Sequence, residues 1–348
     1  MSGLIRVLVI DDSAFVRKVV TQMLARSPFI DVVGAARDGQ EALEMVDRLK
    51  PDVVTLDLVM PVMDGLEFLR RQMAMKPIAA VVCSISHESG AAALEAFELG
   101  AVEFIQKPTA LATDRVFEIA DELVAKVKAA SSVRLAAPPA DASAASAADA
   151  KAVAPEAASN ADIVVIGIST GGPQALRQVI PRFPANFPVP IAVVLHMPVG
   201  YTEMYAQRLN EISALEVVEA KDGETIRAGT MFLAPAGRHL SFRQNGDGSV
   251  RVHLDLRPAD TPHRPAVDVL FRSAADVYGS QVLGVVMTGM GNDGVVGAAH
   301  IKAKGGHIIT EDESSCIVYG MPRAVVEACI SDRVATLAEM ADTITDMI

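Results

Sequence analysis

The chain has 348 residues, a length typical of two domains, and 51% of them are hydrophobic, which is ample for packed cores. Its formal net charge of −12 is spread over both halves and argues against a nucleic-acid binder. No apolar run approaches the ~20 residues of a membrane helix, and the first one stops at Asp11-Asp12, so neither membrane insertion nor a signal peptide is expected. The three cysteines are too few and too scattered for a disulfide framework or a zinc site, which favours a cytoplasmic protein.

Short apolar strands are predicted in the first third of the chain, and several end at a polar side chain. Helical patterns separate these strands, and the alternation predicts a doubly wound parallel sheet. Ligands of such sheets bind at the carboxyl ends of the strands. That edge gathers Asp11, Asp12, Asp57 and Lys107. The three strands concerned are predicted over residues 6–10, 52–56 and 102–106.

Three carboxylates at one edge repel one another unless a cation lies among them. Oxygen ligands in a partly open site suit Mg²⁺. With a divalent ion and Lys107 beside it, Asp57 is a candidate for phosphoryl chemistry. The alternative is that each aspartate merely caps a helix or a turn, which is the usual role of a single such residue. Acidic residues and a lysine at several strand ends make that alternative weak.

Residues 4–128 resemble the receiver domain of bacterial response regulators, which has a flavodoxin-like fold. The resemblance implies that Asp57 accepts the phosphoryl group and that Asp11, Asp12 and Asp57 hold Mg²⁺. It also implies a chemotaxis sensor histidine kinase as the phosphodonor. The further residues matched are Ser84 as the switch hydroxyl, Phe104 as the aromatic switch, Lys107 as the phosphoryl contact, and the loop Met60-Pro61-x-Met63-Asp64-Gly65.

Residues 129–160 are about half alanine and carry almost no large apolar side chains. Such a segment cannot bury a core, so it is predicted to be a linker between a domain at 1–128 and a second domain at 161–348. As a flexible coil it would span on the order of 30 Å, which is about a domain diameter. The two domains can therefore lie face to face.

The second domain begins with a β-branched strand that is predicted to end at Gly167, and a helix is predicted from near Pro173. Ser169 lies in the turn between them. The spacing Gly167-x-Ser169-x-Gly171 fits the nucleophile elbow of hydrolases. Two alternatives remain open at this point. The glycine turn cradles a phosphate at the helix N-terminus, or Ser169 is only a helix cap.

Two later apolar strands end near residues that complete this chemistry. The strand at 190–195 ends at His196, and the strand at 281–287 runs into a glycine-rich loop that holds Asp293. A core histidine or a turn aspartate is a common alternative for each of them. In one parallel sheet, however, these ends share an edge with Ser169, which predicts a Ser-His-Asp triad. Short strands at 231–234, 239–243 and 250–255 are predicted to form a hairpin region.

A series of motifs in residues 161–348 resembles the chemotaxis protein-glutamate methylesterase family. The resemblance implies a second doubly wound α/β domain with a β-hairpin insertion. It also implies a phosphorylation-controlled serine hydrolase that demethylates glutamyl γ-methyl esters on chemoreceptors and deamidates certain receptor glutamines. The motifs are Gly167-Ile-Ser169-Thr170-Gly-Gly, Leu195-His196-Met197-Pro198, Ala234-Pro235-x-Gly237-x-His239, His263-Arg264-Pro265-x-Val267-Asp268, Thr288-Gly289-Met290-Gly291-Asn292-Asp293-Gly294 and Tyr319-Gly320-Met321-Pro322-Arg323.

The family assigns an oxyanion donor to Met290, and Thr170 is a nearby candidate, while the esterase reaction needs no cofactor. His239, His263 and Arg264 are weaker candidates for residues that shape the substrate cleft. We expect the unphosphorylated receiver to dock near the nucleophile and to restrict access to it. The competing functions are a receiver with a binding-only output domain and an output domain that binds phosphate or a nucleotide.

Overall fold

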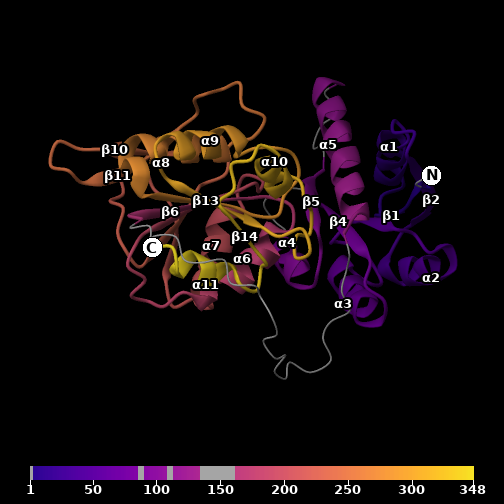
Figure 1. Ribbon diagram of the computed structural model, residues 1–348. Coiled ribbons are helices and arrows are strands. Elements are labelled where there is room, and N and C mark those ends of the chain that lie inside the picture. The colour runs from indigo at the N-terminus through magenta and orange to yellow at the C-terminus, as the bar shows by residue number, and fades with distance from the viewer. Residues whose placement is uncertain (1–2, 85–89, 108–112, 134–160) are drawn as a thin grey trace.

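The computed structural model describes residues 3–84, 90–107, 113–133 and 161–348, with residues 113–118 described by their backbone only. The chain forms two α/β domains that lie side by side, as Figure 1 shows. Each domain is built on a parallel sheet with helices on both faces, which confirms the predicted fold class. Within the described residues, no helix is both long and apolar enough to cross a membrane.

The N-terminal domain has a five-stranded parallel sheet in the order β2-β1-β3-β4-β5. The edge strand β2 was not predicted. The strands are β1 (Ile5–Ile10), β2 (Ile30–Ala36), β3 (Val53–Leu56), β4 (Ala79–Ser84) and β5 (Glu103–Gln106). The helices are α1 (Ala14–Leu24), α2 (Gly39–Leu49), α3 (Gly65–Met75), α4 (Gly90–Glu98) and α5 (Thr113–Ser131).

Local chemistry sets where three of these helices begin. A Ser or Asp side chain precedes each of α1, α2 and α3 and accepts a hydrogen bond from a backbone N–H in the first turn. The residues that cap them are Ser13, Asp38 and Asp64. The central strand β3 is buried along its whole length, which is why its sequence is continuously apolar apart from Thr55.

The boundary of the first domain lies slightly beyond the predicted one. Helix α5 continues to Ser131, Ala129 and Ala130 are buried, and Ala130 packs in a cluster with α1 and the sheet. Three residues that were predicted to be linker therefore belong to the receiver domain. Residues 134–160, which make up the rest of the predicted linker, lie outside the described part of the chain.

The C-terminal domain has a seven-stranded parallel sheet in the order β14-β13-β12-β6-β7-β9-β8. Its strands are β6 (Ile163–Ile168), β7 (Ile191–Leu195), β8 (Glu216–Glu219), β9 (Thr230–Leu233), β12 (Val282–Val286), β13 (His307–Glu311) and β14 (Arg333–Ala335). A separate antiparallel hairpin pairs β10 (His239–Gln244) with β11 (Val250–Asp255). The helices are α6 (Gly172–Val179), η1 (Ile180–Arg182), α7 (Thr202–Glu211), α8 (Val267–Tyr278), η2 (Gly279–Gln281), α9 (Val295–Ala303), α10 (Met321–Glu327) and α11 (Met340–Thr345).

The structure corrects the predicted hairpin region. The hairpin itself is confirmed, but the first of the three predicted strands is β9, which lies in the main sheet and pairs in parallel with β7 and β8. Strand β9 was predicted to join the hairpin because turn residues separate it from β10, whereas its partner β7 lies far away in the sequence. Figure 1 shows α8 and α9 on one face of this sheet and α6 and α11 on the other.

The central strand β6 is buried on both faces of the sheet. Val164, Ile166 and Ile168 pack with α6, α7 and α11, whereas Ile163 and Val165 pack with α8, α9 and the hairpin. Gly167 does not end this strand as predicted but lies within it. A Cβ there would lie 2.3 Å from Cγ1 of Val267, so glycine is needed for helix α8 to approach the sheet.

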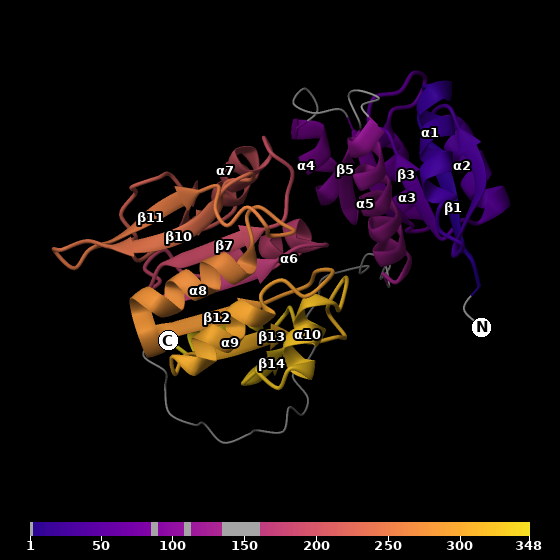
Figure 2. The ribbon, with the colours of Figure 1, turned by 90° about the horizontal axis from the view of Figure 1, so that it is seen from above.

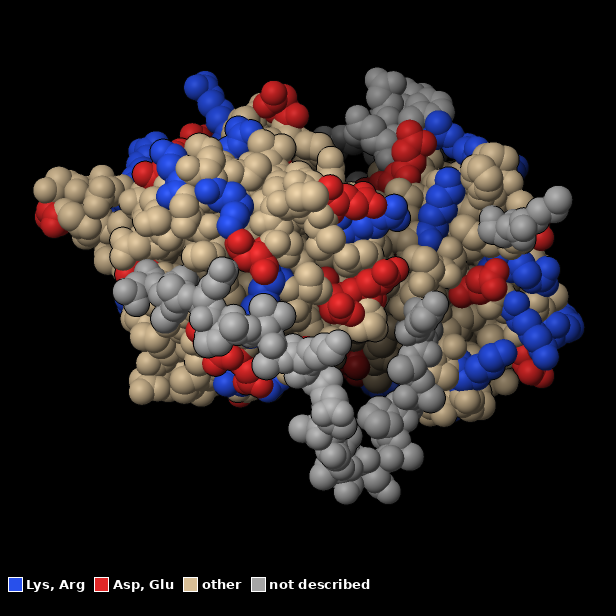
Figure 3. Space-filling model, in the orientation of Figure 1, with Lys and Arg blue, Asp and Glu red and all other residues tan. Residues whose placement is uncertain are grey.

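The two domains share a continuous apolar contact. Figure 2 shows α4 and β5 of the receiver on the side that faces the C-terminal domain. Leu94 of α4 is buried in a cluster formed mainly by β6, β7, α6 and α7. Conversely, Tyr201 of the C-terminal domain is buried in a hydrophobic cluster formed mainly by residues of the N-terminal domain. On the face drawn in Figure 3, acidic and basic side chains are interspersed over both domains.

Candidate active site and phosphorylation site

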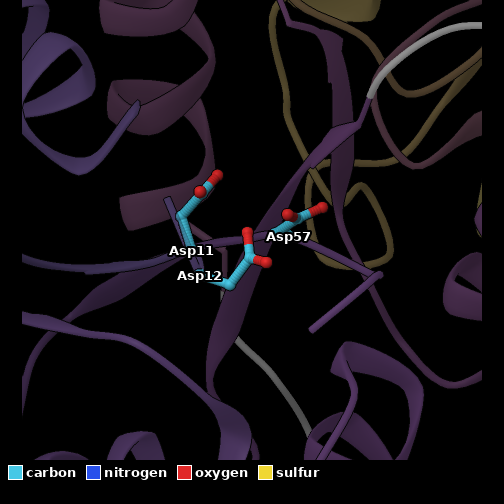
Figure 4. A group of neighbouring side chains, drawn as sticks. All are labelled: Asp11, Asp12 and Asp57. Atoms are coloured by element: carbon cyan, nitrogen blue, oxygen red, sulfur yellow. The ribbon is translucent and has the colours of Figure 1, made fainter. Parts of the chain in front are cut away.

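The carboxyl edge of the receiver sheet brings three aspartates together. Asp11 and Asp12 follow β1, and Asp57 follows β3. One carboxylate oxygen from each lies within 4.8 Å of the others, and Figure 4 shows these side chains. The Nζ atom of Lys107, which follows β5, lies 2.6 Å from Asp11 and 2.7 Å from Asp57. The predicted acidic edge is thus confirmed as a geometric cluster.

The negative charge of this cluster exceeds its positive charge, which favours binding of a cation. Burial raises the pKa of Asp57, and although the Lys107 ammonium opposes that effect, the Asp11 charge adds to it, so the net shift is upward. Three carboxylates face a single ammonium, and carboxylate oxygens are hard ligands that suit Mg²⁺. The residues present therefore fit the Mg²⁺ ion that the sequence resemblance implies.

The two predicted switch residues lie on neighbouring strands. Ser84 is the last residue of β4, and its carbonyl accepts a hydrogen bond from the N–H of Lys107 at 2.8 Å. Phe104 lies in β5, and its ring packs on the ring of Tyr201 with their centroids 4.9 Å apart. Both aromatic side chains are buried. The residue predicted to be the aromatic switch therefore contacts the other domain directly.

The C-terminal domain brings Ser169, His196 and Asp293 together in one hydrogen-bonded row. Oγ of Ser169 lies 3.1 Å from Nδ1 of His196, and Nε2 of His196 lies 2.9 Å from Oδ2 of Asp293. The imidazole and the carboxylate are about one-tenth exposed. Nδ1 faces the serine, so the tautomer that accepts the serine proton carries its own proton on Nε2, and this N–H donates a hydrogen bond to the aspartate.

Asp293 is anchored by a helix as well as by the histidine. Oδ2 accepts a hydrogen bond from the N–H of Val267 at 2.8 Å, and Oδ1 accepts one from the N–H of Asp268 at 3.0 Å. Both donors are in the first turn of α8. Burial by itself would raise the pKa of Asp293, but the bonds from His196 and from these two N–H groups outweigh it and hold the pKa below its usual value.

The turn that carries Ser169 is held from both sides. The N–H of Ser169 donates to the carbonyl of Thr288 at 3.0 Å. The N-cap of α6 is Gly171, which has a φ of +77° and no side chain to cap the helix, so Ser169 is not the cap of this helix. A Cβ on Gly289 would lie 2.8 Å from Cβ of Ser169, so the loop that leads to Met290 runs directly against the nucleophile.

A buried network below the turn was missed by the sequence analysis. The hydroxyl of Thr288 donates to the carbonyl of Thr170 at 2.9 Å, and the N–H of Thr288 donates to Oε2 of Glu311 at 2.9 Å. Glu311 is fully buried at the end of β13, and burial raises its pKa. Glu311 is an acid at the end of an apolar strand, the signal that identified the other site residues, and it could have been found in the same way.

The receiver reaches the residue next to the nucleophile. The hydroxyl of Thr170 donates a hydrogen bond to Oε1 of Glu103, the first residue of β5. The other carboxylate oxygen of Glu103 lies 3.1 Å from Nζ of Lys126 and accepts the N–H of Phe104 at 3.1 Å. Glu103 was not identified from the sequence, although it precedes the predicted aromatic switch.

Further polar contacts join the domains around this point. Oε1 of Glu98 lies 2.6 Å from Nη1 of Arg177 and 2.9 Å from Nη1 of Arg208. The amide of Gln174 donates to the carbonyls of Phe97 and Ala101 at 3.2 and 3.0 Å. These bonds place α4 of the receiver on α6 and α7, which is the docking close to Ser169 that the sequence analysis expected.

The three weaker candidates differ in position. The ring of His263 stacks on that of His196 with centroids 4.1 Å apart, and desolvation together with the nearby His196 lowers the pKa of His263 to about 4. His239 is buried, and its ring nitrogens bond the carbonyl of Pro258 and the N–H of Ala266. It therefore holds the loop before α8. Arg264 donates to a carbonyl of that same loop.

Comparisons with known proteins agree with both halves of the chain. The family described as CheB methylesterase matches residues 164–344, and the response regulator receiver domain matches residues 7–116. A protein-glutamate methylesterase/protein-glutamine glutaminase of Myxococcus xanthus is 52% identical over 97% of this chain and 96% of its own length. One of Halalkalibacterium halodurans is 43% identical over 99% of this chain and 98% of its own. The crystal structure of the Thermotoga maritima CheB methylesterase catalytic domain is 42% identical, with a TM-score of 0.53, over 54% of this chain and 99% of its own.

Proposed function

Because the chain belongs to the CheB methylesterase family and carries a response regulator receiver domain, we propose that Ser169, His196 and Asp293 catalyse hydrolysis of glutamyl γ-methyl esters on chemoreceptors. The hydrogen-bonded row from Oγ of Ser169 through the imidazole to the Asp293 carboxylate supports this assignment. Glutamine deamidation uses the same residues, because both reactions transfer a glutamyl acyl group to water.

The geometry gives each residue a role. Nδ1 of His196 takes the proton of Ser169 as Oγ attacks the ester carbonyl, and it then protonates the leaving methoxide to release methanol. Water attacks the acyl-enzyme with His196 again as the base, which regenerates the serine and leaves a glutamate. With a glutamine substrate, ammonia leaves in place of methanol. Asp293 holds the proton on Nε2 and stabilises the imidazolium.

Backbone N–H groups beside the nucleophile stabilise the oxyanion. Met290 is the stronger candidate, because it follows Gly289, whose backbone lies against Ser169. Thr170 is the weaker one. Its hydroxyl is bonded to Glu103 and its carbonyl accepts from Thr288, so only its backbone N–H is offered for this role.

The receiver controls this reaction through phosphorylation of Asp57. A phosphohistidine of a chemotaxis sensor kinase is the donor. Asp11, Asp12 and Asp57 would hold Mg²⁺, which would supply positive charge for the phosphoryl oxygens, and the Lys107 ammonium beside Asp57 would add a second positive charge. The reaction takes place in the cytoplasm, where the three cysteines stay free, as they are in the structure.

The unphosphorylated receiver restricts the active site because β5 lies on the residue next to Ser169. Phosphorylation draws the Ser84 hydroxyl toward the new group, and Phe104 moves with it. Phe104 packs on Tyr201, and its neighbour Glu103 holds Thr170, so this movement loosens the contact at the active site. A tenfold activation requires only about 1.4 kcal/mol of differential stabilisation.

The two competing functions have less support. A binding-only output domain does not need the assembled row of serine, histidine and aspartate. A phosphate cradle at the glycine turn is disfavoured because a Cβ on Gly171 would lie 2.6 Å from Cβ of Ile317. The Ile317 side chain occupies the space next to this turn.

Methanol release from methylated receptor, with and without a phosphodonor, tests the proposal together with labelling of Ser169 by a fluorophosphonate. We expect Ser169→Ala to abolish labelling and to lower turnover by about 10⁶-fold, because the nucleophile is lost. Unchanged circular dichroism serves as the control for folding. A variant that keeps more than about a tenth of the wild-type rate would remove Ser169 from this role.

A further inference from the structure

Two aspartates cap two neighbouring helices at the triad: Asp293 caps the start of α8, and Asp268 caps the start of α9. Asp293 accepts hydrogen bonds from the backbone N–H groups of Val267 and Asp268 at the start of α8. Asp268 in turn points its carboxylate at the start of α9, where Oδ1 accepts from the N–H of Gly294 at 3.0 Å and from the N–H of Gly297 at 2.7 Å. Each carboxylate therefore satisfies N–H groups that a helix start leaves without a partner.

This arrangement closes a ring around the triad aspartate. Asp293 is the residue before Gly294, which is the N-cap of α9 and has a φ of +102°. The N–H of Asp268 holds the Asp293 side chain, and the carboxylate of Asp268 holds the backbone of the next residue. The side chain and the backbone of the 293–294 turn are thus both fixed by a single residue of α8.

The 293–294 turn and the first turn of α9 pack closely against the start of α8. A Cβ on Gly297 would lie 3.0 Å from Cα of Asp268, and a Cβ on Gly294 would lie 3.0 Å from Cγ1 of Val267. A Cβ on Gly297 would also lie 2.5 Å from Cβ of Phe271, so the starts of α8 and α9 are in close contact. Burial raises the pKa of Asp268, which agrees with a carboxylate enclosed between two helices.

We propose that Asp268 is a positioning residue for the hydrolysis reaction, because its carboxylate fixes the turn that carries Asp293 and so holds Asp293 on His196. The inference rests on the proposed function, since it presumes that Asp293 orients the catalytic imidazole. It concerns neither substrate contact nor proton transfer by Asp268. Without this carboxylate, the N-terminal turn of α9 frays and Asp293 loses its fixed distance to Nε2.

The test compares Asp268→Ala and Asp268→Asn in the full chain, activated by acetyl phosphate and assayed for methanol release from methylated receptor. Fluorophosphonate labelling to completion counts the active sites in each preparation. We expect Asp268→Ala to lower kcat per active site by between about 10- and 100-fold with KM within about twofold, because a misplacement near 1 Å costs this much. We expect Asp268→Asn to recover to within about threefold of wild type, since its carboxamide oxygen still accepts both backbone bonds.

A matched control lies on the same pair of helices. Asp276 also joins α8 to α9, through Nε2 of His300 at 2.8 Å, but it does so at the far end of α8 and at the surface. Asp276→Ala should leave kcat per active site unchanged. A purely structural role for Asp268 would reduce the number of labelled sites and leave kcat per site at the wild-type value, and that result would overturn the inference.

The remaining outcomes are equally decisive. If Asp268→Asn falls as far as Asp268→Ala, acceptance of the backbone bonds is not the cause and the inference is wrong. If Asp268→Ala does not fold, the test is made with Asp268→Asn alone, by its kcat per active site and its labelling rate. A value of either rate more than about tenfold below wild type contradicts the inference. If Ser169→Ala keeps its activity, the proposed function fails. If that variant is inactive while Asp268→Ala turns over normally, only the present inference fails.

Discussion

Two aspartates lie at the carboxyl edges of the two sheets, and their pKa values are shifted in opposite directions. Asp57 follows a central strand of the receiver, and Asp293 lies in the loop after a central strand of the catalytic domain. Burial raises the pKa of both. At Asp57, Lys107 opposes burial but Asp11 adds to it, and the pKa stays above its usual value. At Asp293, hydrogen bonds from His196 and from two backbone N–H groups bring the pKa below it.

The difference shows that the donors around a buried carboxylate, rather than its burial, decide what it can do. Every donor that Asp293 needs is supplied by the protein, so the carboxylate is fixed and suited to orient an imidazole. Asp57 has a lysine on one oxygen, an N–H of Val59 at 3.4 Å from the other, and acidic neighbours. The proposed function completes that site with a cation and a phosphoryl group.

The same substitution at the two positions tests the comparison directly, and the larger effect is expected at Asp293. Asp293→Asn should lower kcat by about 10⁴-fold even with phosphodonor present, because the imidazole loses its tautomer control and the stabilising charge. Asp57→Asn should lose only the increase in rate that acetyl phosphate produces. Methanol release from methylated receptor measures both. If Asp57→Asn still responds to phosphodonor, or if Asp293→Asn keeps more than about 1% of the activity, the roles assigned here are wrong.

Removal of an acid that surrounds Asp57 should weaken the metal site. Asp12→Ala removes one of three clustered carboxylates and should raise the Kd for Mg²⁺ by about tenfold or more. Phosphorylation of Asp57 should then fail at ordinary Mg²⁺ concentrations. Titration of Mg²⁺ by fluorescence or calorimetry and labelling by acetyl phosphate give the two readouts. Undiminished, Mg²⁺-dependent labelling would show that Asp12 is not a ligand.

Removal of the receiver tests whether its contact with the catalytic domain lowers the rate of hydrolysis. A chain that lacks residues 1–133 should hydrolyse methylated receptor about tenfold faster than the unphosphorylated full chain, because β5 no longer lies on Thr170. The cut follows the observed end of α5 rather than the predicted boundary at 128. A truncated protein that is slower than the unphosphorylated full chain would make the receiver an activator.

The smallest expected effect comes from a single interdomain contact. Glu98→Ala removes ion pairs to Arg177 and Arg208, which are about one-third exposed, so each contributes at most about 1 kcal/mol. We expect the basal rate to rise about two- to fivefold. Glu95→Ala is the matched control, because Glu95 lies on the same helix but pairs with Arg70 inside the receiver. Equal rates for the two variants would show that this contact does not hold the domains together.

The sequence alone was enough to place the polar residues at strand ends. An apolar run marks a buried strand, and the residues after it lie at the carboxyl edge of a parallel sheet. Asp57 could therefore be placed at the edge of the first sheet, and Ser169, His196 and the loop of Asp293 at the edge of the second, without a structure. The edge strand β2 was missed because most of its residues are only partly buried and Asp31 interrupts its apolar run. The strand β9 was assigned to the hairpin because turn residues separate it from β10, whereas its pairing with β7 joins segments that are far apart in sequence.

Only the tertiary structure decided which groups surround those residues. The bond from Thr170 to Glu103 joins two domains, and the mutual capping by Asp268 and Asp293 joins two helices. The choice of Nδ1 as the nitrogen of His196 that faces the serine is also tertiary. Periodicity records how a residue relates to its own strand or helix. Contacts between elements depend on how those elements pack, and no pattern in the sequence of one element carries that information.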